Sequence, residues 1–143
     1  MRGGDGSGGL RAWIVRCCQL VTGAIFALAA LSKLGDLHSF AAEIHNFRIV
    51  PIATENLLAI TLPWIELVAA LALLLGIRAR AGAVLASWLL VAFTVAVASA
   101  VARGLDFECG CFGTADGAHV GTRKLVENLA MTLFAVVGAL RRR

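Results

Sequence analysis

Two cysteines separated by a single glycine, Cys109-Gly110-Cys111, form the part of the sequence best suited to chemistry. Cysteines at this spacing can close only a small, strained disulfide ring, and Gly110 removes the Cβ that would obstruct the required turn. Strained and exposed disulfides exchange readily with other thiols, whereas structural disulfides resist reduction. The spacing therefore predicts a redox pair in which Cys109 and Cys111 trade a disulfide with another protein.

Two alternatives remain for the same cysteine pair. Two thiolates suit a soft metal such as copper(I), and His119 could supply a further ligand. In the other alternative, Cys109 and Cys111 are small apolar fillers of a structural turn. A second pair, Cys17 and Cys18, is adjacent, and neighbouring residues of a helix point about 100° apart. We interpret these two as apolar packing residues.

Three ionisable residues lie in apolar segments, where a charge is costly and by default indicates function or pairing inside a bundle. Lys33 ends the first apolar segment, Glu66 lies in the second one turn after Pro63, and Glu127 lies near the start of the last. We expect all three in the outer half of a bundle, beneath the Cys-Gly-Cys loop, as supporting polar residues. An ion pair of Lys33 with Glu66 or Glu127 is slightly favoured over a proton relay. The two are compatible, because a dithiol reaction releases or takes up protons.

Long apolar segments must position these side chains. Of the 143 residues, 59% are hydrophobic and 15% charged, against about 45–50% and about 25% in soluble domains. The apolar residues gather in blocks long enough to span a bilayer. We therefore predict an all-α membrane protein with one domain, residues 11–143, after a Gly-rich disordered tail, residues 1–10. The four predicted transmembrane helices cover residues 13–34, 57–75, 81–101 and 123–140.

Lysines and arginines near the ends of the spans predict the orientation of the bundle. The side of both termini carries Arg2, Arg11, Arg16, Arg78, Arg80, Arg141, Arg142 and Arg143. The opposite side carries fewer: Lys33, Arg48, Arg103, Arg123 and Lys124. This bias predicts cytoplasmic termini and a Cys-Gly-Cys loop on the outer face of a bacterial plasma (inner) membrane. The net charge of +4 comes largely from these flanks, so lipid headgroups explain it better than a nucleic-acid partner.

The loop between the first two spans is long and contains a helical pattern. Phe40, Ile44 and Phe47 recur at helical spacing, and Pro51 ends the pattern. This spacing predicts a short helix over Ser39–Phe47 lying on the outer membrane surface. An irregular loop with its aromatic side chains in lipid is the alternative.

Several strings of residues together resemble the methylamine-utilisation MauE family. The resemblance covers about residues 13–140, and its most specific part is the string that contains the two cysteines. It is carried by Leu31-Ser32-Lys33-Leu34, Phe40, Ile49-Val50-Pro51, Leu62-Pro63-Trp64-Ile65-Glu66, Cys109-Gly110-Cys111-Phe112-Gly113 and Asn128.

This resemblance implies a four-helix membrane protein related to the DoxX-like group, similar to the bundle of vitamin K epoxide reductase-type proteins. MauE is associated with maturing the disulfide-rich small subunit of methylamine dehydrogenase, beside a thioredoxin-like partner. Carried over by residue, Cys109 and Cys111 would be the redox pair, with Lys33 and Glu66 as polar positions in the bundle. One departure is the absence of a Cys-x-x-Cys motif, which puts quinone reduction by this chain alone in doubt.

These observations together favour extracytoplasmic thiol–disulfide exchange that supports maturation of an exported disulfide-containing protein. The expected partners are a thioredoxin-like exported protein and membrane lipid, and a quinone acting through a partner is the candidate electron carrier. The chain would then be a component of a thiol–disulfide oxidoreductase. The rival functions are a copper(I)-handling membrane module and a non-catalytic anchor for a thioredoxin-like protein.

Overall fold

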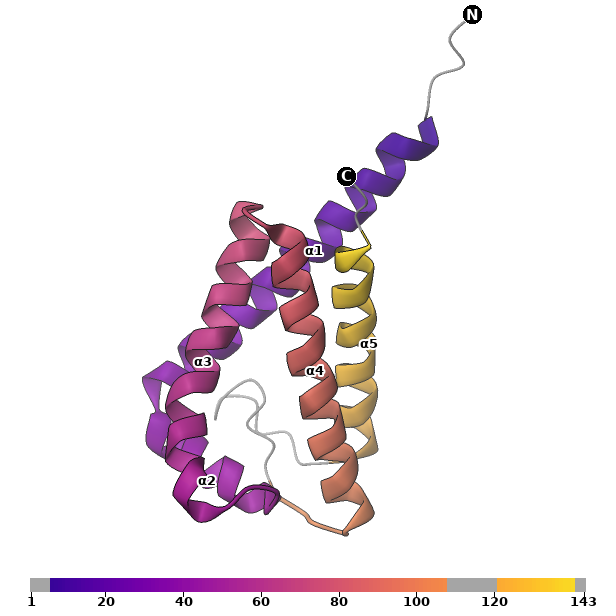
Figure 1. Ribbon diagram of the computed structural model, residues 1–143. Coiled ribbons are helices and arrows are strands. Elements are labelled where there is room, and N and C mark those ends of the chain that lie inside the picture. The colour runs from indigo at the N-terminus through magenta and orange to yellow at the C-terminus, as the bar shows by residue number, and fades with distance from the viewer. Residues whose placement is uncertain (1–5, 108–120, 141–143) are drawn as a thin grey trace, which may run out of the picture.

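The computed structural model describes residues 6–107 and 121–140, and these ranges form helices without strands. The predicted all-α class is therefore confirmed for the described chain. In Figure 1, α3, α4 and α5 stand side by side, α1 crosses behind them, and α2 lies across the lower end. The start of α1 and the end of α5 lie at the opposite, upper end. The elements are α1 (Gly6–Gly35), α2 (Leu37–Phe47), α3 (Ile52–Leu75), α4 (Ala79–Ala102) and α5 (Thr122–Ala139).

Among the described residues, three helices are long and apolar enough to cross a bilayer: Gly8–Gly35 of α1, all of α3 and all of α4. Their large apolar side chains are exposed on the outside of the bundle, including Trp13, Trp64 and Trp88. Such an apolar exterior fits lipid as the surrounding solvent. The helix α5 has 18 residues and begins with several charges, so its composition alone does not mark it as a span.

Helices extend beyond the apolar blocks that the sequence marks. α1 begins at Gly6, within the segment predicted as a disordered tail, and α3 begins at Ile52 instead of residue 57. Hydropathy detects only the part of a helix that matches the hydrocarbon core, whereas the helical backbone continues into the interface. Pro51 sets the start of α3, because it is the N-cap residue and has an extended conformation.

The helix predicted over Ser39–Phe47 is confirmed as α2, which begins two residues earlier, at Leu37. Asp36 caps it: the side chain accepts hydrogen bonds from the backbone N–H of Ser39 at 3.0 Å and from its hydroxyl at 2.6 Å. These two bonds lower the pKa of the Asp36 carboxyl below its ordinary value, because they favour its charged form. At the other end, Arg48 adopts the left-handed conformation that ends the helix.

Small residues allow the long helices to pack closely. A Cβ added at Gly82 of α4 would lie 2.9 Å from the Cβ of Ala72 and 3.1 Å from the carbonyl oxygen of Ala69, both on α3. A Cβ at Gly23 of α1 would lie 3.0 Å from Leu73. Interfaces of small residues are typical of helices that associate in membranes. The buried apolar core comprises Phe26, Ala69, Ala70, Leu73, Ala83, Ala86, Leu90 and Ala135.

Candidate functional site

A buried ion pair joins the last turn of α1 to α3. The Nζ atom of Lys33 donates to both carboxylate oxygens of Glu66, at 2.7 and 2.9 Å. The side chains are 0% and 3% exposed. The pair predicted from the sequence is thus present with Glu66 as the partner.

Two aromatic rings flank the Lys33 ammonium. Its Nζ atom lies 5.1 Å from the ring centre of Phe40 on α2 and 4.9 Å from that of Phe93 on α4. Both distances are within the range in which a cation is attracted to the face of a ring. Four helices therefore surround the charge: α1 supplies the lysine, α3 the carboxylate, and α2 and α4 the rings. This arrangement compensates the lysine after its removal from water.

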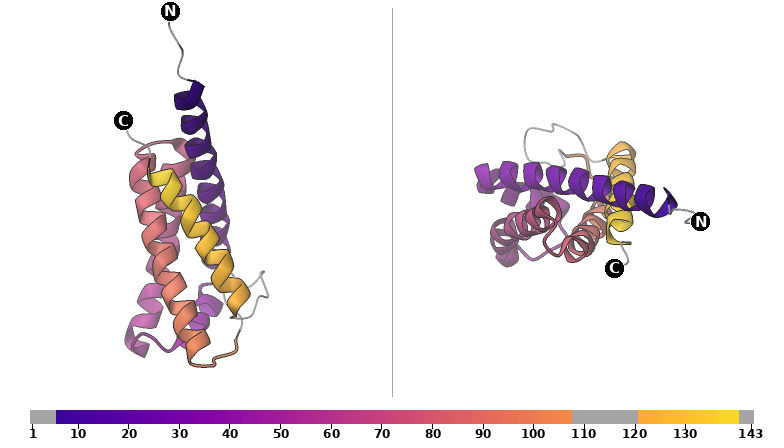
Figure 2. Two further views of the ribbon diagram at one scale, coloured as in Figure 1. Left: turned by 90° about the vertical axis from the view of Figure 1, so that its right-hand side faces the viewer. Right: turned by 90° about the horizontal axis from the view of Figure 1, so that it is seen from above.

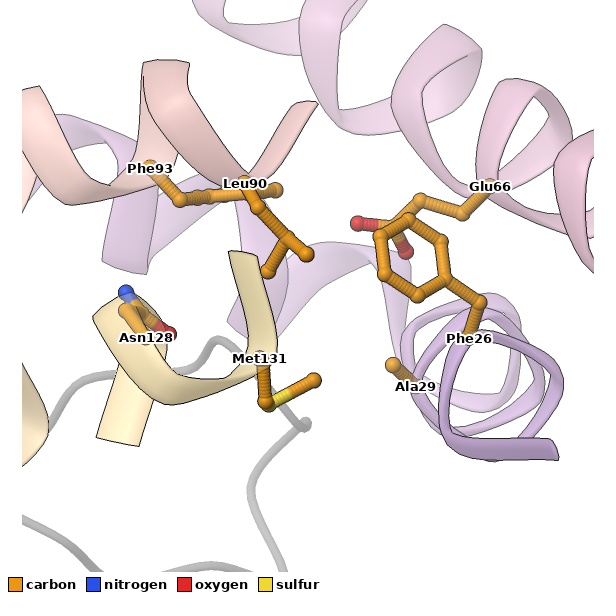
Figure 3. Close-up of a pocket in the computed structure, with 7 residues that line it drawn as sticks. All are labelled: Phe26, Ala29, Glu66, Leu90, Phe93, Asn128 and Met131. Carbon is orange, nitrogen blue, oxygen red and sulfur yellow. The ribbon is translucent and has the colours of Figure 1, made fainter. Parts of the chain in front are cut away.

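On the side of α5, the Glu66 carboxylate borders a cavity of about 20 Å³. Figure 3 shows Glu66 entering from one side and Asn128 of α5 from the other, with apolar side chains between them. Asn128 is 1% exposed, and its side-chain nitrogen has no hydrogen-bond partner within the described ranges. The cavity is therefore polar at two points and apolar elsewhere. Its remaining lining residues are Phe26, Ala29, Leu90, Phe93 and Met131.

Glu127, the third ionisable residue singled out in the sequence, does not join this cluster. Its carboxylate is paired on its own helix, with the Nε atom of Arg123 at 3.0 Å and the Nζ atom of Lys124 at 3.5 Å. The sequence left Glu66 and Glu127 open as partners of Lys33, and the structure pairs Lys33 with Glu66. The two glutamates belong to different helices, and the single ammonium of Lys33 is already bonded by both oxygens of Glu66.

The Cys-Gly-Cys motif lies outside the described residues, as does His119. The segment that precedes it is described as far as Phe107 and contacts α2. The ring of Phe107 packs edge-on against Phe47 at the end of α2, with ring centres 4.8 Å apart. Arg103, just after α4, donates to the carbonyl oxygens of Phe47 and Arg48. The chain before the motif is thereby fixed to α2, whose Phe40 contacts Lys33.

Sequence reasoning missed two polar contacts at the opposite end of the bundle. Arg16 of α1 donates to the carbonyl oxygens of Leu73 and Leu74 at 2.8 Å each, where the carbonyls at the end of α3 lack helical partners. Gln19 donates to the carbonyl oxygen of Gly138 at 2.8 Å. Both contacts could have been suspected from the sequence, because Arg16 and Gln19 are polar residues inside an apolar span. Arg16 counted only toward orientation, and Gln19 was not singled out.

Another pair links α2 to the first turn of α3. The Nδ1 atom of His45 lies 3.0 and 3.1 Å from the two carboxylate oxygens of Glu55. The His45 side chain is about half exposed, whereas Glu55 is buried. This contact holds the short helix against the start of α3.

The fold and its buried charges define an integral membrane protein, built as a helical bundle around the buried Lys33–Glu66 ion pair. The model of one family, Methylamine utilisation protein MauE, matches residues 11–141. The chain belongs to this family, as its sequence motifs predicted.

Curated relatives carry the same name, Methylamine utilization protein MauE. The chain is 34% identical to the one from Paracoccus denitrificans over 113 residues, which are 78% of this chain and 61% of that protein. It is 40% identical over 89 residues to the one from Methylorubrum extorquens, covering 62% of this chain and 48% of that protein. For Paracoccus versutus the identity is 34% over 117 residues, covering 81% and 63%. The chain thus spans about half to two-thirds of these relatives, and no solved structure matches it.

Proposed function

We propose that this chain is a membrane component of extracytoplasmic thiol–disulfide exchange, in which Cys109 and Cys111 trade a disulfide with an exported, thioredoxin-like protein. The observation that carries the proposal is the position of the motif in the chain. It begins two residues after Phe107, whose ring packs against Phe47 at the end of α2, the helix whose Phe40 flanks Lys33. The relatives' name refers to methylamine utilisation, and the resemblance to the family implies a disulfide-containing client of the methylamine dehydrogenase type.

The exchange needs no resident cofactor. The thiolate of one cysteine attacks a disulfide of the partner, forms a mixed disulfide and releases one partner thiolate. The second cysteine then attacks the mixed disulfide, so that Cys109 and Cys111 become oxidised and the partner leaves with two thiols. Two electrons move to the partner in this direction, and the same steps in reverse oxidise it. In that reverse direction Cys109 and Cys111 end as thiols, and a quinone acting through another protein would accept their two electrons and two protons and restore the disulfide.

The proposal includes four membrane spans with α5 as the fourth. In Figures 1 and 2, α5 runs alongside α4 through most of the bundle, and it contacts both α4 and α1. Its charged residues Arg123 and Glu127 lie in its first two turns, at the end where α4 finishes, so they can reach an interface. With cytoplasmic termini, the Cys-Gly-Cys loop would then face outward from the inner membrane.

Reporter fusions test this topology. A fusion after Arg143 should behave as cytoplasmic, and a fusion near residue 115 should behave as external, because one span separates them. An external signal from the fusion after Arg143 would remove the fourth span and the proposed orientation with it.

Thiol trapping tests the chemistry. In membranes placed in mild redox buffers, Cys109 and Cys111 should switch between oxidised and reduced forms, and Cys109→Ser should accumulate a mixed disulfide through Cys111 with an exported protein. Cys17→Ser is the matched control, because Cys17 lies in the first half of α1, far along that helix from Lys33 in its last turn. This variant should form no mixed disulfide that the wild type lacks. If both thiols instead stay reduced in an oxidising buffer and bind copper(I) without trapping a partner, the chain handles metal. Full activity in Cys109→Ser would leave it as an anchor.

A further inference from the structure

A cleft opens between the beginning of α1 and the end of α5, at the end of the bundle away from α2. The two helices meet where Gln19 donates to the carbonyl oxygen of Gly138 at 2.8 Å. Beyond this contact, α1 continues past the last turn of α5 (Figure 2). The space left between the two helices has a volume of about 270 Å³. Its lining residues within the described chain are Leu10, Arg11, Ile14, Val15, Val137 and Leu140.

Five of these six side chains are apolar, and the sixth is a cation. Leu10, Ile14 and Leu140 are exposed, so the walls of the cleft present hydrocarbon to the surroundings of the bundle. Arg11 has no carboxylate to pair with on the adjoining parts of either helix, because α1 contains no acidic residue and α5 has none after Glu127. A hydrocarbon surface with an arginine is complementary to a molecule that has an apolar chain and an anionic head.

The cleft lies where a bilayer changes from hydrocarbon to headgroups. The candidate span of α1 covers Gly8–Gly35, so the cleft residues of α1 belong to the first turns of that span. Trp13 is exposed on the same turns, and tryptophan is enriched at the membrane–water interface. An acyl chain can therefore lie between the helices while its headgroup stays beside Arg11. In the sequence, Leu140 is followed directly by three further arginines, Arg141-Arg142-Arg143.

We infer that this cleft binds an anionic phospholipid, with an acyl chain against the apolar side chains and the phosphate at Arg11. Arginine binds phosphate through two parallel N–H bonds, and basic pockets between transmembrane helices on the cytoplasmic side bind anionic headgroups. With the cytoplasmic termini proposed above, the lipid belongs to the inner leaflet. A free phosphate would use the arginine alone, whereas the lipid also covers the hydrocarbon walls. The site does not involve the cysteine pair, so this inference and the proposed function can fail separately.

Native mass spectrometry of the purified full chain tests the inference. The protein is held in a neutral detergent with equal amounts of phosphatidylglycerol, which is anionic, and phosphatidylcholine with the same acyl chains, which has no net charge. The wild type should retain phosphatidylglycerol preferentially. Arg11→Gln should lower this preference about fivefold, the factor that corresponds to about 1 kcal/mol for a basic residue near anionic lipid. Equal retention of the two lipids by the wild type would overturn the inference.

Arg80→Gln is the matched control for charge. Arg80 is an exposed arginine near the start of α4 and does not line the cleft, so its loss should leave the preference close to that of the wild type. Equal losses in Arg11→Gln and Arg80→Gln would mean that the lipid responds to summed charge, and the cleft would be refuted as its site.

Ile14→Trp tests the apolar part of the site, because it fills the cleft without changing the charge. Retention of phosphatidylglycerol should fall in this variant, and unchanged retention would show that no acyl chain lies between α1 and α5. The folding of each variant is checked in micelles without phosphatidylglycerol. There Arg11→Gln should unfold at the same midpoint as the wild type, because its lost contact is with the lipid. A lower midpoint there would mean that Arg11 stabilises the protein itself and would count against the lipid contact.

Discussion

Two of the carboxylate pairs in the described chain differ sharply in their surroundings. Lys33–Glu66 connects two helices in the interior, with side chains 0% and 3% exposed. Arg123–Glu127 lies along one helix at its first turns, with side chains 92% and 39% exposed. The bond lengths are similar, 2.7 and 3.0 Å. The two pairs therefore differ in the burial of their side chains and not in the length of their bonds.

Burial changes what happens when one partner is lost. An exposed charge regains water, so its ion pair adds little to stability. A buried charge cannot, and removing its partner leaves it uncompensated in a medium of low dielectric constant. The difference makes Lys33 and Glu66 interdependent, whereas the exposed Arg123 can be replaced without leaving its own partner as a fully buried charge.

The largest effect is expected from Lys33→Ala. This variant strands the Glu66 carboxylate beside the cavity and should lower the free energy of unfolding by about 3–5 kcal/mol. Denaturant titration of purified protein in mixed micelles measures the loss. Replacing Glu66 by Ala in the same chain should recover part of it, since both buried charges are then gone. Additive effects of the two substitutions would show that the residues do not act as a pair.

A smaller loss is expected from Arg16→Met, which tests a charge bonded to backbone carbonyls instead of a carboxylate. The variant removes both hydrogen bonds from Arg16 to the last turn of α3, and hydrogen bonds of charged groups are worth about 1.5–3 kcal/mol. Stability in the same titration should fall by about that amount. Arg11→Met is the control, because Arg11 is exposed on the same helix and should leave stability nearly unchanged. If the two variants lost equal stability, the bonds of Arg16 to α3 would contribute nothing, and Arg16 would serve only to orient the chain in the membrane.

Arg123→Ala should change stability by only about 0.3–0.5 kcal/mol, the range of exposed pairs four residues apart on a helix. Added salt should weaken even this contribution. The measurement is the same unfolding titration at low and high ionic strength. A loss as large as that of Lys33→Ala would contradict the distinction between the two pairs and would mean that α5 depends on Arg123.

The most local effect concerns Asp36, an exposed carboxylate whose partner is Ser39. Because its pKa in the folded chain is lowered, its contribution is present above the ordinary carboxyl pKa and is lost as pH falls through the lowered value. Acidification should therefore fray the first turn of α2, seen as faster amide hydrogen exchange there after correction for the intrinsic rate. Asp36→Ala should show the faster exchange already at neutral pH, and an unchanged exchange pattern would remove Asp36 as the cap.

The sequence predicted the buried centre better than its surroundings. Lys33 and Glu66 stood out because a charge within an apolar span has few alternatives to pairing. The helix α2 was predictable from the spacing of Phe40, Ile44 and Phe47. Asn128 was quoted only as part of a family pattern, because an amide carries no charge that demands a partner. Only the structure shows that it lines the same cavity as Glu66.

The choice between Glu66 and Glu127 could not be made from spacing. It depends on which helices face α1, and hydropathy carries no information about neighbours. The bonds from Arg16 to α3 depend in the same way on helix ends that meet only in the folded bundle. Whether α5 spans the membrane also depends on packing, because its first turns contain Arg123, Lys124 and Glu127.

The close contact of α3 with α4 determines which positions of this chain can accept new residues. At Gly82, even one methyl group would meet the backbone oxygen of Ala69, so the interface tolerates neither bulkier natural variants nor a spectroscopic label. The outward faces have the opposite property, since Trp64 and Trp88 already carry large side chains there. Divergence within this architecture should therefore concentrate on outward positions, and those same positions are where a fluorescent or spin label can report on the bundle without disturbing it.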